Sequence, residues 1–112
     1  MTENLFSYGT LQIENVQLET FGRKLISSSD RLPRYEIRDC LIKDQNVINA
    51  SGKSIHPIAC FTGDVNHVIS GTVLQVTLEE LEQADRYEVD DYMRIKCTLK
   101  SGKQAWVYVK NG

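Results

Sequence analysis

Short runs of apolar and β-branched residues, separated by residues that favour turns, account for most of this 112-residue chain. In several runs apolar and polar positions alternate every second residue, a pattern typical of strands with one buried face. The pattern predicts about six strands. The main runs are Leu5–Tyr8, Tyr35–Ile42, Ile55–Phe61, Val68–Val76, Tyr92–Leu99 and Gln104–Val109.

Turn-forming residues between these runs predict two hairpins. Lys43-Asp44-Gln45-Asn46 follows the Tyr35–Ile42 run and precedes a return run that begins at Val47. Lys100-Ser101-Gly102-Lys103 joins the last two strands, and its glycine supplies the positive φ that such turns need. Gly71 lies inside a strand-like run, where it predicts a bulge or a close backbone approach.

The clearest helix start is Thr77-Leu78-Glu79-Glu80, which has the Thr-x-x-Glu form of a capping box. In this motif the hydroxyl and the carboxylate each satisfy an otherwise unpaired amide of the first turn. The motif predicts a helix from Leu78 to about Asp85. A looser helical pattern over Asn15–Leu25 predicts a second helix, and Ser27–Asp30 then breaks the pattern.

Short strands joined mostly by turns, with one or two helices, predict an α+β fold. We expect a small mixed or antiparallel β-barrel of about six strands, flanked by the helices. The composition, 41% hydrophobic and 25% charged, is that of an ordinary globular domain. Because no linker-like stretch or internal repeat interrupts the chain, residues 1–112 are expected to form a single domain.

The charge balance argues against some partners. A net charge of −2 disfavours nucleic acid and a polybasic membrane contact. The sequence has no apolar run long enough to cross a membrane, and its start does not resemble a signal peptide. We therefore expect a cytoplasmic protein with neither nucleic acid nor membrane as a partner.

Cysteines and histidines give no sign of a metal site or a disulfide framework. Cys40, Cys60 and Cys97 are odd in number and widely separated, so they are predicted to be reduced core thiols. His56 and His67 have no acidic or cysteine neighbours at a spacing that would complete a closed metal site. We expect no metal and no other cofactor.

Common catalytic motifs are also missing from the sequence. It contains neither the nucleophile-elbow pattern, nor the glycine-rich dinucleotide and phosphate loops, nor a zinc-protease pair. These reaction classes therefore have no sequence support.

Two carboxylates near the end of the capped helix are unusual. At ~100° per residue, Leu78, Leu81, Asp85 and Glu88 fall within roughly 80° of one another, so the carboxylates extend an apolar stripe. A carboxylate beside a core is costly unless it is paired, which makes these residues either hydrogen-bonded structural groups or functional ones. Nearby basic residues that offer salt bridges are Arg86 and Arg94.

Two sequence segments together carry a resemblance to a known family. They are Leu5-Phe6-Ser7-Tyr8-Gly9-Thr10-Leu11 and Asp85-x-x-Glu88-x-x-x-Tyr92-x-Arg94. This combination resembles the γ-glutamylcyclotransferase-like, or AIG2-like, family, and the Pro57 segment and Val68–Val76 are similar to its middle strands. The resemblance implies a small β-barrel flanked by helices, with a cavity between the glycine loop and the acidic residue.

The same resemblance implies an activity and roles for individual residues. A γ-glutamyl amine or γ-glutamyl amino acid would cyclise to 5-oxoproline and release the amine. Glu88 matches the catalytic acid and base, and Asp85 and Arg94 are supporting residues. The positions that match substrate-binding residues are Tyr8, Gly9, Thr10, Leu11 and Tyr92.

The implied reaction is intramolecular and needs no enzyme nucleophile, so the only partner it requires is a small γ-glutamyl substrate. We expect a monomer or homodimer. One alternative is a noncatalytic small-molecule-binding domain of the same fold. Another is a small β-barrel that contacts nucleic acid or protein through its tyrosines, which the acidic charge disfavours.

Overall fold

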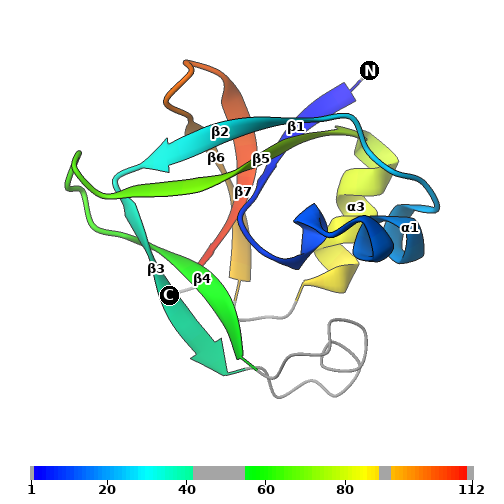
Figure 1. Cartoon of the computed structure of the whole chain (residues 1–112), viewed down its shortest axis with the longest axis horizontal. Coiled ribbons are helices and arrows are strands. Elements are labelled where there is room, and N and C mark those ends of the chain that lie inside the picture. The colour runs from blue at the N-terminus through cyan, green and yellow to red at the C-terminus, as the bar shows by residue number, and fades with distance from the viewer. Residues whose placement is uncertain (1, 42–54, 89–91, 111–112) are drawn as a thin grey trace.

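In the computed structural model, the chain forms a seven-stranded mixed sheet with helices packed at one end (Figure 1). The structure describes residues 2–41, 55–88 and 92–110. The α+β class is as predicted. In chain order the elements are β1 (Thr2–Ser7), the 3-10 turn η1 (Thr10–Gln12), α1 (Glu14–Phe21), β2 (Ser27–Pro33), β3 (Tyr35–Leu41), β4 (Ile55–Phe61), β5 (Val68–Thr77), α3 (Leu78–Tyr87), β6 (Tyr92–Thr98) and β7 (Gln104–Lys110).

Strand β7 is the centre of the sheet. The strands follow the order β2-β5-β1-β7-β4-β3, and β6 pairs antiparallel with β7 along its length. On its other edge, β7 pairs in parallel first with β1, where Leu5 faces Trp106, and further along with β4, where Ala59 faces Val109. Two strands therefore share one edge of β7, and they separate from each other along it.

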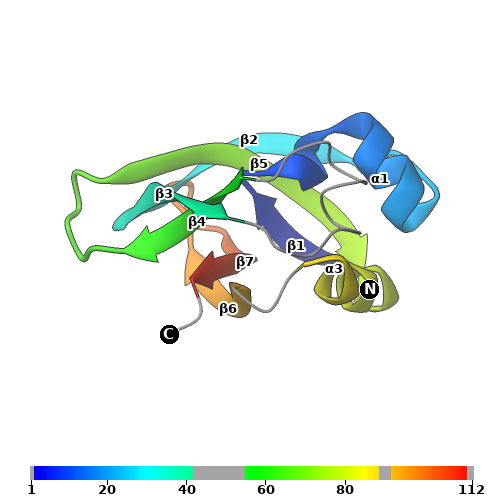
Figure 2. The ribbon, with the colours of Figure 1, turned by 90° about the horizontal axis from the view of Figure 1, so that it is seen from below.

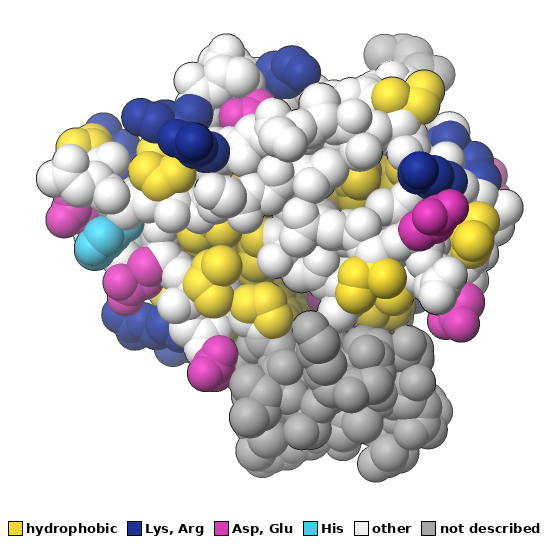
Figure 3. Space-filling view, viewed as in Figure 1, with side chains coloured by type: hydrophobic (Ala, Val, Ile, Leu, Met, Phe, Trp, Pro, Cys, Tyr) yellow, Lys and Arg dark blue, Asp and Glu magenta, His cyan; other side chains and the backbone are white. Residues whose placement is uncertain are grey.

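The sheet is not closed into the barrel that the strand pattern predicts. Its path ends at β2 on one side and β3 on the other. The additional strand is β2, where the serines from Ser27 predict a break. Among the described strands this segment pairs with β5, and most of its polar side chains face solvent while Leu32 is buried. Between the part of the sheet made by β2 and β5 and the part made by β3 and β4, apolar side chains are exposed in a hollow (Figure 3).

Two apolar clusters lie on opposite faces of the sheet. Phe6, Val73 and Val107 belong to the cluster inside the curve of the sheet. Their neighbours Leu5 and Leu74 belong to the cluster beneath the helices. Successive apolar side chains along β1 and β5 therefore pack on opposite faces of the sheet. Both helices lie at the same end of the sheet, beside β1 and β5 (Figure 2).

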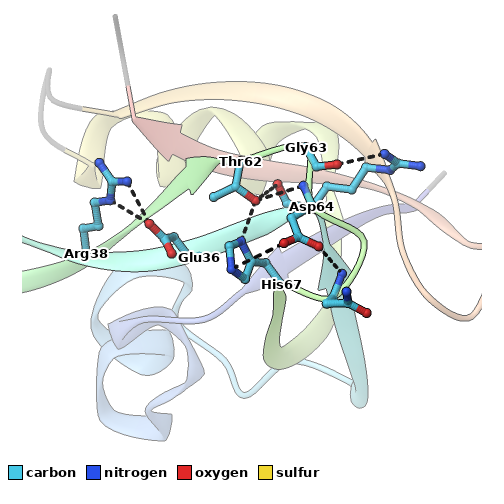
Figure 4. Close-up of polar contacts among 8 residues, drawn as sticks. Glu36, Arg38, Thr62, Gly63, Asp64 and His67 are labelled. Atoms are coloured by element: carbon cyan, nitrogen blue, oxygen red, sulfur yellow. Dashed lines mark hydrogen bonds and ion pairs between the residues drawn. The ribbon is translucent and has the colours of Figure 1, made fainter.

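A sharp corner at Arg34 joins β2 to β3. Arg34 has a φ of 73°, which is uncommon for a residue other than glycine. Its carbonyl accepts hydrogen bonds from the amides of Thr62 and Gly63 at 2.8 and 3.2 Å, so the corner is held by the turn after β4. Within that turn the Thr62 hydroxyl lies 2.8 Å from His67 Nδ1, beside Asp64 (Figure 4).

Local predictions are largely confirmed. Thr77 and Glu80 form the capping box, and Gly102 has a φ of 92° in the predicted turn between β6 and β7. The return run from Val47 lies outside the described residues, and β3 pairs antiparallel with β4. One correction concerns the predicted stripe on α3: Leu78 is 63% exposed on the outer side of the first turn, and Asp85 has a side chain that is 38% exposed.

The buried face of α3 consists of Glu80, Leu81 and Ala84. Cys60 is a buried free thiol, and Cys97 is a half-buried one.

Gly71 occupies a position where a side chain does not fit. A Cβ there would lie 2.5 Å from the carbonyl oxygen of Ser7 and 2.6 Å from Cζ of Phe6, which confirms the predicted close approach. We expect Gly71→Ala to lower the free energy of unfolding by about 1–3 kcal/mol, measured by urea denaturation, because the strands must move apart. Ser70→Ala, at an exposed position of the same strand, is the control. Wild-type stability of Gly71→Ala would contradict this packing.

Candidate active site

Tyr8 bridges the gap that opens where β1 and β4 separate along β7. β1 ends at Ser7, and the next residue sends its phenol between the other two strands. The hydroxyl donates to the carbonyl of Tyr108 on β7 and accepts a hydrogen bond from the amide of Ala59 on β4 at 3.0 Å. Tyr8 thus bridges the separated strands and fixes the start of the following loop.

Gly9 begins that loop with a φ of −122° and a ψ of −145°. Left-handed geometry is therefore not the reason for a glycine here. A Cβ at this position would approach Pro57 Cγ at 3.9 Å. The missing side chain keeps space open between the loop and β4.

Side chains hold the rest of the loop in place. The buried amide of Gln17 donates to the carbonyl of Leu11 at 2.9 Å and accepts from the amide of Leu25 at 3.0 Å. The hydroxyl of Thr10 lies 2.7 Å from that of Tyr87 at the end of α3. This last contact ties the glycine loop to the helix end that carries the candidate acid.

Glu88 is the residue at which α3 ends. Its amide completes the last helical hydrogen bond, to Ala84 at 3.0 Å, and its own backbone is extended with a ψ of 146°. Burial raises the pKa of the Glu88 carboxyl to about 7, and the nearby carboxylate of Asp85 adds to this effect. The carboxyl is therefore able to hold and release a proton near neutral pH.

A small pocket, open to solvent, lies between the glycine loop and Glu88. Tyr92 stands in its wall and donates a hydrogen bond to the carbonyl of Pro57 at 2.8 Å. The pocket brings together the two segments that the sequence singles out. Its lining residues are Leu5, Phe6, Ser7, Tyr8, Gly9, Thr10, Leu11, Pro57, Glu88, Tyr92 and Tyr108.

Asp85 and Arg94 lie beside the pocket and are not among its lining residues. Asp85 Oδ1 accepts a hydrogen bond from the Tyr108 hydroxyl at 2.7 Å and pairs with Arg94 Nε at 3.0 Å. Tyr108 is a pocket residue that the sequence did not assign to the site. Its alternation with Trp106 suggests a shared face of the last strand, but this pattern does not identify Asp85 as its partner.

The two sequence motifs line one pocket, and this arrangement is the one expected for a single family. A sequence model described as "Gamma-glutamyl cyclotransferase, AIG2-like" matches residues 5–112. The chain belongs to this family. The match covers nearly the whole chain.

Solved structures share the fold at low sequence identity. Two Arabidopsis thaliana proteins studied in solution have TM-scores of 0.71 and 0.73 at 19% and 21% identity, and the alignments cover 98% and 97% of this chain. They cover 62% and 68% of those chains, so this chain spans less than two thirds of the first neighbour. A third structure, named gamma-glutamyl cyclotransferase, has a TM-score of 0.71 at 12% identity, covering 100% of this chain and 68% of that one.

No curated protein matches the sequence. Within residues 2–41, 55–88 and 92–110, no group of three His, Cys, Asp or Glu side chains is arranged to hold a metal ion. In the same described part of this AIG2-like protein, no helix is long and apolar enough to span a membrane.

Removal of the Tyr8 hydroxyl tests the bridge between the separated strands. Tyr8→Phe leaves the Ala59 amide and the Tyr108 carbonyl without this partner, and we expect the free energy of unfolding to fall by about 1–3 kcal/mol. Tyr92→Phe, which removes the bond to one carbonyl, is expected to cost less. Urea denaturation measures both. Equal stability of Tyr8→Phe and wild type would show that the bridge does not hold the strands.

The raised pKa of Glu88 predicts a pH-dependent stability difference. The folded state favours the neutral acid, so this group's contribution is complete below the ordinary pKa of 4.5 and is lost as pH rises through about 7. Gln cannot ionise, so the stability of Glu88→Gln relative to wild type should increase between these pH values. Urea denaturation at both ends of the range, with Glu82→Gln as control, measures it. A difference that does not vary with pH would contradict the buried carboxyl.

Proposed function

We propose that this protein is a γ-glutamyl cyclotransferase that converts a γ-glutamyl amine or amino acid into 5-oxoproline and a free amine, with Glu88 as general acid and base. One observation carries the proposal: a single pocket is lined both by the Tyr8–Leu11 segment and by a carboxyl with a pKa of about 7. Membership of the AIG2-like family supports the reaction class.

The proposed reaction takes place within the substrate. Its α-amine nitrogen attacks the γ-carbonyl carbon, a five-membered ring forms, and the γ-amide C–N bond breaks. Well-oriented intramolecular attack reaches effective molarities of about 10⁵–10⁸ M, so holding the substrate folded is the main task of the pocket. A small pocket walled by aromatic and aliphatic side chains suits that task.

Proton transfer is the second task, and the environment of Glu88 makes it easier. In water, an α-ammonium with a pKa of about 8 would lose its proton to a carboxylate whose pKa is lower by roughly 3.5 units. At Glu88, with a pKa of about 7, the difference falls to about one unit. Glu88 would accept the ammonium proton before attack and return it to the leaving amine.

The glycine loop would bind the glutamyl part of the substrate. The first amides of a helical turn have no acceptor within the turn. In the proposed reaction those of η1 would donate to a substrate carboxylate or to the developing oxyanion. The Tyr8 and Tyr92 hydroxyls already donate to backbone carbonyls, so these residues contribute mainly their rings as walls.

Glu88→Gln tests the proposal directly. We expect 5-oxoproline release from γ-glutamyl amines and amino acids to fall at least about 100-fold, because loss of a general acid–base removes a contribution of about 10²–10⁴. Binding, measured as a ligand-induced thermal shift, should persist. In wild type, kcat/KM should fall as pH drops below about 7, since protonated Glu88 cannot accept a proton.

Glu82→Gln, exposed on the same helix, is the matched control and should keep full turnover. Undiminished turnover in Glu88→Gln would remove Glu88 from the mechanism. Ligand binding by wild type without product would favour a noncatalytic binding domain of the same fold.

A further inference from the structure

Asp85 is the charged neighbour of Glu88 on the same helix. It lies three residues earlier, a spacing that places two side chains on one face of a helix. Two partners from neighbouring strands hold its carboxylate: the Tyr108 hydroxyl on β7 at 2.7 Å and Arg94 Nε on β6 at 3.0 Å. Tyr108 itself lines the pocket, so the contacts reach from Asp85 to the site.

Arg94 is held firmly at the outer end of these contacts. Its guanidinium carbon lies 4.6 Å from the centre of the Trp106 ring, and its side chain is only 25% exposed. Packing against the ring fixes the planar guanidinium, and Nε then faces Asp85. A continuous series of contacts therefore runs from the sheet surface to the pocket wall, through Trp106, Arg94, Asp85 and Tyr108.

We propose that Asp85 and Arg94 are an opposed pair of positioning charges for Glu88: Asp85 favours its protonated form, and Arg94 limits that preference. The inference rests on the proposed role of Glu88 as acid and base. The pair sets the pH at which Glu88 gains or loses its proton, and it does not contact the substrate.

The other groups around Glu88 are neutral phenols. The Tyr8 and Tyr92 hydroxyls donate hydrogen bonds to carbonyls, so they carry their protons. Burial raises the pKa of Tyr87 and of Tyr108, and the bond to Asp85 raises the latter further. Asp85 is the charged group that acts directly on Glu88, and Arg94 is paired with Asp85. Glu19 on α1 is a further acidic neighbour of Tyr87. Asp90 and Asp91 lie outside the described residues.

Opposite signs give the proposal a distinctive signature. Asp85→Asn removes a negative charge, so Glu88 should ionise at a pH lower by about one unit. Arg94→Gln removes a positive charge, so Glu88 should ionise at a higher pH. In the double variant the two effects oppose each other, and the midpoint should return toward that of wild type. Loss of packing alone would not move the midpoint in opposite directions.

The experiment is an NMR titration of the Glu88 side-chain carboxyl in protein labelled with ¹³C-glutamate and assigned with Glu88→Gln. It is performed without substrate on wild type, both single variants and the double variant. Arg94→Lys keeps the charge and should titrate close to wild type. Arg38→Gln breaks a comparable pair with Glu36 on β3, 2.8 Å long, and should leave the midpoint unchanged (Figure 4).

Midpoints that move in opposite directions, with Arg94→Lys close to wild type, support the proposal. Shifts in the same direction, or no shift, overturn it. If Asp85→Asn does not fold, the comparison of Arg94→Gln with Arg94→Lys still decides whether the charge of Arg94 acts on Glu88.

The titration requires no turnover, so its outcome is separate from that of the proposed function. If Glu88→Gln abolishes product formation while the midpoints stay fixed, only the charge pair is rejected. If the midpoints move as expected while Glu88→Gln keeps its activity, the acid–base role is rejected and the charge pair stands. Where both hold, the acid limb of kcat/KM should shift in each variant with its midpoint.

Discussion

A single edge of β7 serves two strands, and the pocket depends on this constraint. β1 pairs with the first part of that edge and β4 with the last, so the two strands separate between their contacts. Backbone groups left behind by such a separation must find partners, because unpaired buried amides and carbonyls are costly. The Tyr8 hydroxyl is the partner of two such groups, the Ala59 amide and the Tyr108 carbonyl. The opening is thereby stabilised rather than closed, and its walls become the candidate site.

The helix that presents Glu88 is fixed at its start. Glu80 completes the capping box and also accepts two hydrogen bonds from the Arg23 guanidinium, at 2.7 and 2.8 Å. Arg23 lowers the pKa of this carboxyl, so Glu80 stays charged while Glu88, at the other end, is pushed toward its neutral form. The same helix therefore carries a structural carboxylate at one end and a candidate catalytic one at the other, distinguished by their partners.

The sequence supports the local parts of the fold more strongly than the long-range ones. The Thr77–Glu80 box, the turn around Gly102 and the close approach at Gly71 each depend on chemistry within a few residues or on one missing side chain. Strand β2 carries no apolar alternation because Leu32 is its one buried position, so its serines are typical of a loop. Closure of the sheet likewise depends on strand pairings that periodicity does not encode.

Much the same holds for the candidate site. The Tyr8–Leu11 segment and Glu88 stand out by resemblance, and the fold places them around one pocket. Their roles in binding and catalysis stay predictions. The bond from Tyr108 to Asp85 joins residues 23 positions apart on different elements, and strand alternation alone shows only that Tyr108 is buried. Contacts of this kind follow from the packing of helix on sheet rather than from local pattern.

The central place of β7 also bears on the order in which the molecule assembles. Its pairing with β1 joins residues about a hundred positions apart, whereas the β6–β7 hairpin is local. Contacts so distant in sequence form slowly, because a long loop must close before they contribute any stability. Until β7 docks, β1 and β4 have no common neighbour, and the space between them is undefined. The pocket should therefore be among the last features of the native state to appear during folding.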